Sequence, residues 1–401
     1  MSDLDRLLEA FESGALLRPD AADPNFIDLV RAVAALAGVE DLDRSPNSEA
    51  MSAVIGQPEH LVFVLADGLG THFIEDELGA ESWLSQHLVQ PIRSVYPSTT
   101  SAAITSLATG CWPCTHSVAG WWNYLPQLGE PIVVLPFLRL SDGARLDTST
   151  DLTVADAIPL PPLMQRMTRD AALFQPRAIV DSAYSTYFGG NAERIPYGNL
   201  SEAVSGIARR IRSAASPTHT YWYVPNVDHQ AHEHGCQSAQ VRTALLEVDR
   251  AVATLEKQLE GSSSRIVLTA DHGHVDAGTK IPLAADDPLC DYLRSAPSGD
   301  MRIAFFHVRS GQFDAFEDEF RSRFGEHFVL LTTDQFDELR LLGPDLLSEE
   351  TRRRVGDYTA IALDTSVFHY TGGFDEDRFM QQHSHHSGLS AREMTVPMIV
   401  G

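Results

Sequence analysis

The sequence is poor in cysteine and in long apolar runs, and each shortage excludes a class of protein. Four cysteines in 401 residues are too few for a disulfide framework. No apolar run approaches the roughly 18 residues that a transmembrane helix needs. The first residues, "MSDLDRLLEAFESG", lack the basic-then-apolar order of a signal peptide. We therefore expect a cytoplasmic protein that does not associate with membranes.

Positive charge is also scarce, since 30 lysines and arginines face 55 acidic residues and give a formal net charge of −25. This balance excludes binding of a nucleic-acid duplex through its phosphates, and binding to an anionic membrane surface. A protein of this charge that handles phosphate esters needs bound cations or local positive groups to offset the field. The content of 43% hydrophobic and 21% charged residues is typical of a globular protein.

Two of the cysteines, Cys111 and Cys114, form a "CWPC" motif that raises the question of redox activity. A redox motif of this kind lies at a strand-to-helix junction of a thioredoxin-like unit. Here it follows "SLATG", which is typical of a helix end. The context therefore favours two small buried thiols over a redox pair.

Three apolar segments share one pattern: "HLVFVLADG" at 60–68, "TYWYVPNVD" at 220–228 and "RIVLTADHG" at 265–273. Each predicts a strand buried on both faces that ends at an aspartate. Helical patterns lie between them, as at 238–261. We predict an α/β fold with a mostly parallel central sheet sandwiched by helices. Ligands of such sheets bind at the carboxyl ends of the strands, where the aspartates lie.

The rest of the chain predicts additions to this core. Residues 1–56 have helical patterns and form an N-terminal helical segment, followed by a catalytic domain over 57–401. Two inserted cap segments, at about 121–217 and 278–381, interrupt the alternation of strands and helices. The second contains "RIAFFHV", "FDAFEDEFRSRFG" and "FVLLTT", which predict a strand, a helix and a strand.

Ionisable residues gather at the predicted strand ends and near the C-terminus. Asp228 and His232 are four residues apart, so one helical turn places them on the same face. Carboxylates and imidazoles that converge in this way would repel or lie unsatisfied without cations, and together they suit Zn²⁺ and related divalent metals. We expect two divalent ions among Asp67, Asp228, His232, Asp271, His272 and the cluster His383, His385 and His386.

A candidate nucleophile lies in "YPSTTSAAITSLATG", residues 96–110. Serines and threonines ahead of an Ala-rich segment are typical of a helix N-terminus, where they often serve only as caps. Such an end also favours anions, both an alkoxide and a phosphate. A hydroxyl at this position and next to a divalent metal would have a lowered pKa and act as a nucleophile.

The series "ADG", "YPSTTSAAITSLATG", "VDHQAH", "ADHGH" and "HHSGLS" resembles the alkaline phosphatase superfamily, in particular its type I phosphodiesterase/nucleotide pyrophosphatase branch. The motifs occur in the family's order and span residues 65–401. The resemblance implies an alkaline phosphatase-like fold and two metal ions, most simply Zn²⁺ with Mn²⁺ as the alternative. It also implies a small-molecule phosphate ester as the substrate, and leaves the oligomeric state open.

The resemblance also implies roles for individual residues. One metal would be held by Asp67, the nucleophile Thr100, Asp271 and His272. The other would be held by Asp228, His232 and His386. Thr100 is preferred to Thr99 because of its distance from "TG" at 109–110, and His386 to His385 because it precedes "SGLS". His229 and His234 are then expected to face solvent or to support the ligands.

The sequence departs from the family around the nucleophile. Thr100 is followed by "SAA" where the family has Phe-Pro-Asn, and a second family Asn, which helps hold the phosphoryl oxygen, aligns with Trp121. Asn123 is the candidate catalytic residue for that role, as a neutral donor to developing charge. Trp121, Trp122 and Tyr124 either stack on a flat group of the substrate, such as a nucleobase, or pack in the core.

We predict a two-metal hydrolase of phosphate diesters or pyrophosphates, with nucleotide-type substrates included, that works through a phosphothreonine intermediate. No Cys/Ser-x-Pro-x-Arg motif of a sulfatase occurs. A phosphomonoesterase, phosphonate hydrolase or phosphomutase is the alternative, and would need an arginine from an insertion, for example from "ETRRRVGD". A catalytically silent metal-binding protein is the alternative of another class, but it would be expected to have lost a ligand or the nucleophile.

Overall fold

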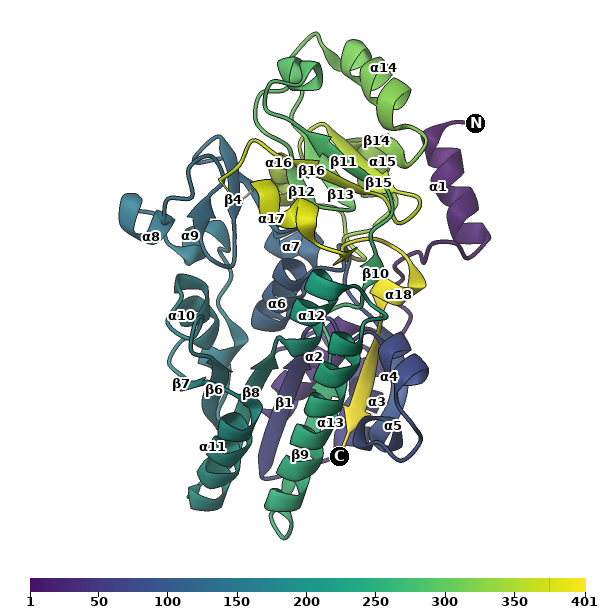
Figure 1. The fold of residues 1–401 in the computed structure, drawn as a ribbon. Coiled ribbons are helices and arrows are strands. Elements are labelled where there is room, and N and C mark those ends of the chain that lie inside the picture. Colours follow the sequence, from purple (N-terminus) through teal and green to yellow (C-terminus); the bar gives the residue numbers. More distant parts are fainter. Residues whose placement is uncertain (375) are drawn as a thin grey trace.

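A central sheet of seven strands organises the molecule, and the computed structural model describes residues 1–374 and 376–401 (Figure 1). The strand order is β2-β18-β9-β1-β8-β6-β7, and only β18 runs antiparallel to its neighbours. The predicted α/β fold with a mostly parallel sheet is therefore confirmed. The strands are β1 (His60–Ala66), β2 (Leu88–Arg93), β6 (Asp170–Pro176), β7 (Glu193–Tyr197), β8 (Thr218–Val224), β9 (Ser264–Thr269) and β18 (Thr395–Val400).

The three predicted apolar strands are neighbours at the middle of this sheet. β1 pairs in parallel with β8 on one side and with β9 on the other. Ala66 lies opposite Val224, and Leu65 lies opposite Thr269, so all three strands end at the same edge. Because both faces of β1 are covered, nearly every one of its side chains is buried. The polar residues that follow these strands are thus brought together.

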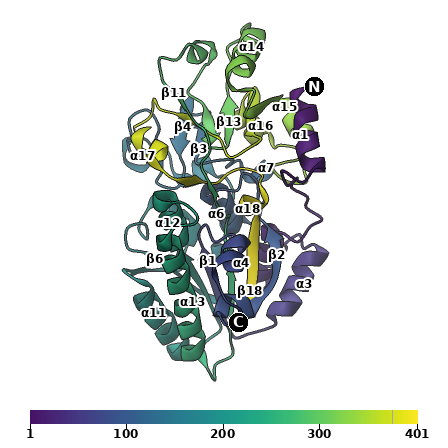
Figure 2. The same ribbon diagram turned by 45° about the vertical axis from the view of Figure 1, so that its right-hand side comes forward.

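Helices cover both faces of the sheet (Figure 2). On one face lie α11 (Leu200–Ser213), α12 (Asn226–His234) and α13 (Ala239–Leu259). On the other lie α2 (Phe26–Leu36), α3 (Pro46–Ile55) and α6 (Thr100–Thr109). The shorter helices around the sheet are α4 (Thr71–Glu77), α5 (Trp83–His87), α7 (Pro113–His116), α10 (Ala183–Gly189), α18 (Ala391–Met394) and the 3₁₀ helix η1 (Leu163–Arg166).

A second sheet of seven strands lies above the carboxyl ends of the central strands (Figure 1). Its order is β14-β15-β13-β12-β3-β4-β5, and its neighbours pair antiparallel. Its strands are β3 (Trp122–Leu125), β4 (Glu130–Val133), β5 (Leu138–Arg139), β12 (Ser298–Asp300), β13 (Ile303–Phe306), β14 (Phe328–Thr332) and β15 (Tyr358–Ala362).

The two expected insertions thus combine in one sheet, because β3 pairs with β12. The expected strand, helix and strand are β13, α14 (Phe313–Phe324) and β14. The predicted bounds of the first insertion are too wide, since β6 and β7 lie within 121–217 but belong to the central sheet.

The remaining elements of this upper part are short. They are the helices α8 (Leu146–Ser149), α9 (Val154–Ala157), α15 (Thr333–Glu338), α16 (Glu349–Val355), α17 (Glu376–Gln381) and η2 (Pro288–Tyr292). Two strand pairs complete it: β10 (Val275–Asp276) with β17 (Ser384–His385), and β11 (Lys280–Leu283) with β16 (Val367–Tyr370).

The N-terminal helices are divided between the two sheets. α1 (Asp3–Glu12) packs beside β14 of the second sheet, and Arg6 Nη1 donates a 2.7 Å hydrogen bond to Gly325 O. α2 and α3 instead join the core of the central sheet, where Phe26 and Ile55 are fully buried. The three helices within residues 1–56 therefore pack as parts of the two larger bodies.

The "CWPC" cysteines are free thiols at the start of α7. Cys114 is buried, Cys111 is partly buried, and burial raises the pKa of both thiols. A raised pKa disfavours the reactive thiolate, which agrees with a packing role. In the described part of the chain, no helix combines the length and apolarity of a membrane span.

Candidate active site

The candidate site lies where the central strands end beneath the second sheet. Asp67 follows β1, Asp271 follows β9, and Asp228 stands in the first turn of α12 after β8. The backbone ties two of them together, because the Asp228 N–H donates to Asp67 O at 3.1 Å. The expectation that three carboxylates meet at one sheet edge is met in this structure.

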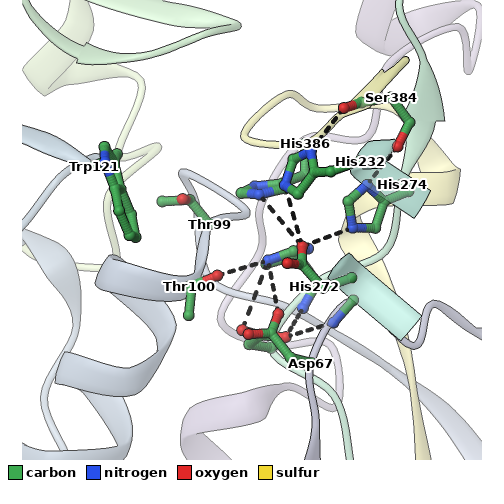
Figure 3. A network of polar contacts seen from close by, with 12 residues as sticks. Asp67, Thr99, Thr100, Trp121, His232, His272, His274, Ser384 and His386 are labelled. Atoms are coloured by element: carbon green, nitrogen blue, oxygen red, sulfur yellow. Dashed lines mark hydrogen bonds and ion pairs between the residues drawn. The ribbon is translucent and has the colours of Figure 1, made fainter. Parts of the chain in front are cut away.

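His272 is the centre of a first cluster (Figure 3). Its Nε2 atom lies 3.4 Å from Asp67 Oδ1 and 3.6 Å from Asp271 Oδ2. The same Nε2 lies 3.1 Å from Thr100 Oγ1. The side chains of Asp67, Asp271 and His272 are at most 2% exposed. The four residues expected at the first metal are therefore assembled.

The two carboxylates of this cluster each have one oxygen held and one free. Asp271 Oδ1 accepts 3.0 Å hydrogen bonds from the Gly68 and His272 N–H groups, and Asp67 Oδ2 accepts one from the Tyr223 hydroxyl. Asp67 Oδ1 and Asp271 Oδ2 are buried, with no hydrogen-bond partner among the described residues. Buried carboxylate oxygens are costly when left unpaired, and a cation between them removes that cost. The donor set fits a divalent metal.

A second cluster surrounds Asp228. Its Oδ1 atom lies 3.2 Å from His232 Nε2 and 3.8 Å from His386 Nε2. The ligand atoms of Asp228, His232 and His386 all lie within 4.8 Å of one another. His232 comes from α12, whereas His386 comes from the loop after β17, so the chain reaches this point from two directions. These are the three residues expected at the second metal.

The imidazole rings of both clusters are oriented by backbone carbonyls. His272 Nδ1 donates to Gly273 O at 3.0 Å, His232 Nδ1 to Ser384 O at 2.8 Å, and His386 Nδ1 to Ser98 O at 3.1 Å. A carbonyl only accepts, so each Nδ1 carries a proton, and each ring turns its Nε2 atom toward the carboxylates. This is the arrangement of histidines that ligate metals.

Electrostatics at the site reflect the crowding of acids. Burial, followed by repulsion from Asp271 and Asp228, raises the pKa of Asp67 well above its ordinary range. Burial also acts against ionisation of Asp228, but the neighbouring His232 and His274 outweigh it and hold the pKa of Asp228 well below its ordinary value. Carboxylates with pKa values driven apart in this way mark functional sites.

His274 is a part of this site that the sequence reasoning missed. Its Nε2 lies 2.9 Å from Asp228 Oδ1, and its Nδ1 lies 3.2 Å from Ser384 Oγ. The ring is fully buried, and burial lowers the pKa of His274 to about 4. The motif "ADHGH" contained the signal, because a second histidine two residues after His272 lies beside the same strand end. His229 and His234, by contrast, are 57% and 38% exposed and lie near Glu233.

The nucleophile candidates differ in their surroundings. Thr100 begins α6 and lines a large cavity, and its Oγ1 faces His272. The Thr99 hydroxyl instead donates to Asp300 Oδ2 at 2.7 Å and is fully buried. Thr100 is thus the threonine whose hydroxyl is available at the clusters. Of the neighbouring histidines His385 and His386, it is His386 whose Nε2 lies 3.8 Å from Asp228 Oδ1.

Asn123 does not reach the site as expected. Its amide is occupied by the local turn, where Oδ1 accepts from the Ala119 N–H at 2.8 Å and Nδ2 donates to Gly120 O. The side chain is buried on β3, and it does not line the cavity. The physical reason is alternation along the strand: the neighbouring Trp122 faces the cavity, so Asn123 points the other way.

A cavity of about 760 Å³ opens from the two clusters. Asp67, Thr100 and Asp228 form one end, and Trp121 and Trp122 line the wall. Figure 3 shows Trp121 beside Thr99 and Thr100, on the opposite side from the histidines. Tyr124 packs against His307, with ring centroids 3.9 Å apart. Two of the three aromatic residues singled out in the sequence therefore face the space in which a substrate would lie.

The family model of type I phosphodiesterases/nucleotide pyrophosphatases matches residues 61–387. The chain belongs to this family. The match covers both clusters, the Thr100 helix and the two segments that build the second sheet, so this family member is a hydrolase of the alkaline phosphatase superfamily, as predicted. No curated protein sequence matches the chain significantly.

Solved structures of low sequence identity share the fold of this family member. Murine ectonucleotide pyrophosphatase/phosphodiesterase 5 is 15% identical, with a TM-score of 0.62 over 84% of this chain and 87% of that one. An inactive variant of the murine protein was solved with AMP. Phosphonoacetate hydrolase from Sinorhizobium meliloti 1021, in complex with phosphonoformate, is 17% identical, with a TM-score of 0.58 over 86% and 90% of the two chains.

Proposed function

We propose that this family member hydrolyses phosphate diesters or pyrophosphates of small molecules through a phosphothreonine intermediate at Thr100. The observation that carries the proposal is the position of Thr100: its hydroxyl lies 3.1 Å from His272 Nε2, at the junction of the clusters and the cavity. The hydroxyl therefore faces both the proposed metal ligands and the space for a substrate.

Two divalent cations, which we propose to be Zn²⁺, would be held by the two clusters. Asp67, Thr100, Asp271 and His272 would hold one. Asp228, His232 and His386 would hold the other. When bound, such ions act as Lewis acids that lower the pKa of a hydroxyl or a water and neutralise charge on phosphoryl oxygens. Imidazole and carboxylate donors of this kind suit Zn²⁺, and Mn²⁺ is the alternative.

The chain itself would position and activate the nucleophile. The free N–H groups at the start of α6 favour an alkoxide on Thr100 and an anionic phosphoryl group beside it. Thr100 Oγ1 would attack phosphorus, the bond to the leaving oxygen would break, and an alcohol or phosphate would depart into the cavity. Water would then cleave the phosphothreonine and restore the hydroxyl. The backbone carbonyls that fix the three imidazoles keep this arrangement in place.

The distribution of positive charge favours a diester or a pyrophosphate. The arginines of "ETRRRVGD" are engaged elsewhere: Arg352 pairs with Asp337 at 3.1 Å, and Arg354 pairs with Glu350 at 2.8 Å. The cations among the described residues that line the cavity are Arg145, Arg177 and Arg378, all exposed. Thr100, in contrast, is 7% exposed. The buried end thus lacks the extra charge that a monoester needs, and a cavity of about 760 Å³ suits a large substrate.

The test is a comparison of bis-p-nitrophenyl phosphate with p-nitrophenyl phosphate, on protein whose metal content has been measured. We expect two metal ions per chain and a higher kcat/KM for the diester. Faster cleavage of the monoester would contradict the proposal and move the protein to the phosphatase or mutase side. Absence of cleavage at full metal content would support the catalytically silent alternative.

A further inference from the structure

The wall of the cavity changes character between its two ends. The buried end holds Thr100 and Asp67, which are 7% and 2% exposed. The middle of the wall is apolar and aromatic, and includes Ile104, Trp122, Val133, Leu140, Tyr184 and Phe188. These side chains are themselves buried in the protein. A substrate with its phosphorus at Thr100 would therefore lay a large apolar or aromatic group along this wall.

Three arginines line the cavity among the described residues. Arg145 precedes α8, Arg177 follows β6 and Arg378 lies on α17, so three separate segments each contribute one. All three residues are exposed. In a chain of net charge −25, an exposed arginine on the cavity wall is a local point of opposite charge that can attract an anion.

Within the part of the chain that the structure describes, the Arg177 guanidinium is free to bind a ligand. Arg145 is already paired with Asp147, at 2.6 Å between Nη2 and Oδ2. No hydrogen bond or ion pair to the Arg177 guanidinium is found among the described residues, and only its backbone N–H is engaged, with Tyr197 O at 3.0 Å. Asp181 lines the same cavity and also forms no ion pair within the described chain, so it does not neutralise the Arg177 guanidinium by direct contact.

We propose that the substrate carries a second anionic group, separated from the scissile phosphate by a bulky apolar or aromatic body, and that Arg177 binds this group. The inference rests on the proposed function. A second phosphate adjacent to the first would lie near Thr100, which is 7% exposed, whereas Arg177 lines the same cavity as an exposed residue. A guanidinium recognises a carboxylate or a phosphate with paired donors, so either anion fits.

The test uses two p-nitrophenyl phosphate diesters with the same aryl-alkyl second alcohol, which ends in a carboxylate in one compound and in its methyl ester in the other. We expect wild-type protein to have a higher kcat/KM for the acid. Arg177→Gln should reduce the ratio of kcat/KM for the acid to kcat/KM for the ester about 3- to 10-fold, mainly by raising KM for the acid. The reason is the loss of an exposed ion pair with charge-assisted hydrogen bonds. Arg209→Gln is the control, since Arg209 is an exposed arginine of α11 outside the cavity.

The outcomes separate the two proposals. Cleavage of both diesters with equal efficiency, or an equal ratio in wild type and Arg177→Gln, would overturn the role of Arg177 while the phosphodiesterase proposal stands. Cleavage of neither diester would overturn the proposed function. In that case, binding of the corresponding carboxylate-bearing phosphonate, measured by calorimetry on both proteins, still decides whether Arg177 binds the anion.

Discussion

His272 Nε2 lies 3.1 Å from Thr100 Oγ1, although 172 residues separate the two along the chain. The contact joins the loop after β9 to the first turn of α6. Because His272 Nδ1 donates to Gly273 O, the ring is held with its Nε2 atom toward the hydroxyl and the free carboxylate oxygens. This relationship links the proposed nucleophile to the proposed metal ligands, and the first prediction follows from it.

Replacement of Thr100 by Ala should lower kcat for a diester at least about 10³-fold, because the attacking oxygen is lost. Metal content should remain close to that of wild type, since the carboxylate and imidazole ligands are intact. Thr99→Ala is the matched control: its hydroxyl is occupied by Asp300, so we expect the larger part of the activity to persist. Steady-state kinetics and metal analysis check both variants, and an active Thr100→Ala protein would refute the nucleophile assignment.

Removal of metal by a chelator should destabilise the protein, because the three carboxylates then repel one another. Metal at about 100 times its Kd would add about 2.7 kcal/mol to the free energy of unfolding. Added metal should raise the free energy of unfolding of Asp67→Asn less than that of wild type. Without metal, the variant should be at least as stable as wild type, because burial and repulsion already raise the pKa of Asp67 and make its charged form costly. Thermal unfolding with and without Zn²⁺ measures this. An equal gain in both proteins would contradict the first cluster as a metal site.

His274 should hold the Asp228 carboxylate in place for the second metal. His274→Ala removes the 2.9 Å contact to Asp228 Oδ1, and loss of such a supporting residue typically weakens metal affinity about 10- to 100-fold. His229→Ala is the control, because that ring is 57% exposed on the same helix as His232. Equilibrium dialysis against Zn²⁺ gives the affinities, and equal values for the two variants would show that His274 has no such role.

Acid should destabilise the fold through His116, which lies outside both clusters. Burial lowers the pKa of His116 from 6.5 to about 3, and its Nε2 lies 2.9 Å from Ser106 Oγ. Between these two pKa values only the unfolded chain binds the proton, so the free energy of unfolding falls as pH falls below 6.5. From about pH 7 to about pH 5.5, wild type should lose about 1 kcal/mol more than His116→Gln in urea unfolding. Equal losses would refute the prediction.

Asn123 should matter for stability and not for catalysis. Asn123→Ala leaves the buried Ala119 N–H without its 2.8 Å acceptor, which typically costs about 1–3 kcal/mol. The variant should therefore unfold at lower denaturant concentration, while kcat for a diester at a temperature where it remains folded stays near the wild-type value. A large fall in kcat with unchanged stability would restore the role that the sequence suggested for this residue.

The sequence by itself determined the three middle strands of the central sheet and most of the candidate site. Apolar runs that end in "ADG", "NVD" and "ADHG" are local signals, and parallel strands place their ends at one edge. The α/β fold and the family follow from them. The site residues converge because most of them lie within a few residues of a strand end at this edge, and one comes from the C-terminal loop after β17. The first set is Asp67, Asp228, His232, Asp271 and His272, and the loop residue is His386.

The tertiary structure alone decided which side chains face the site and which segments pair. Asn123 and Trp122 are adjacent on β3, and strand alternation sends one to the turn and the other to the cavity. The two insertions form one sheet because Gly299 pairs with Trp122, a contact between segments far apart in the sequence. His274 likewise meets Asp228 of another segment, and Arg177 lines the cavity together with residues far away in the sequence. Local periodicity sets each element, but long-range packing sets what its side chains meet.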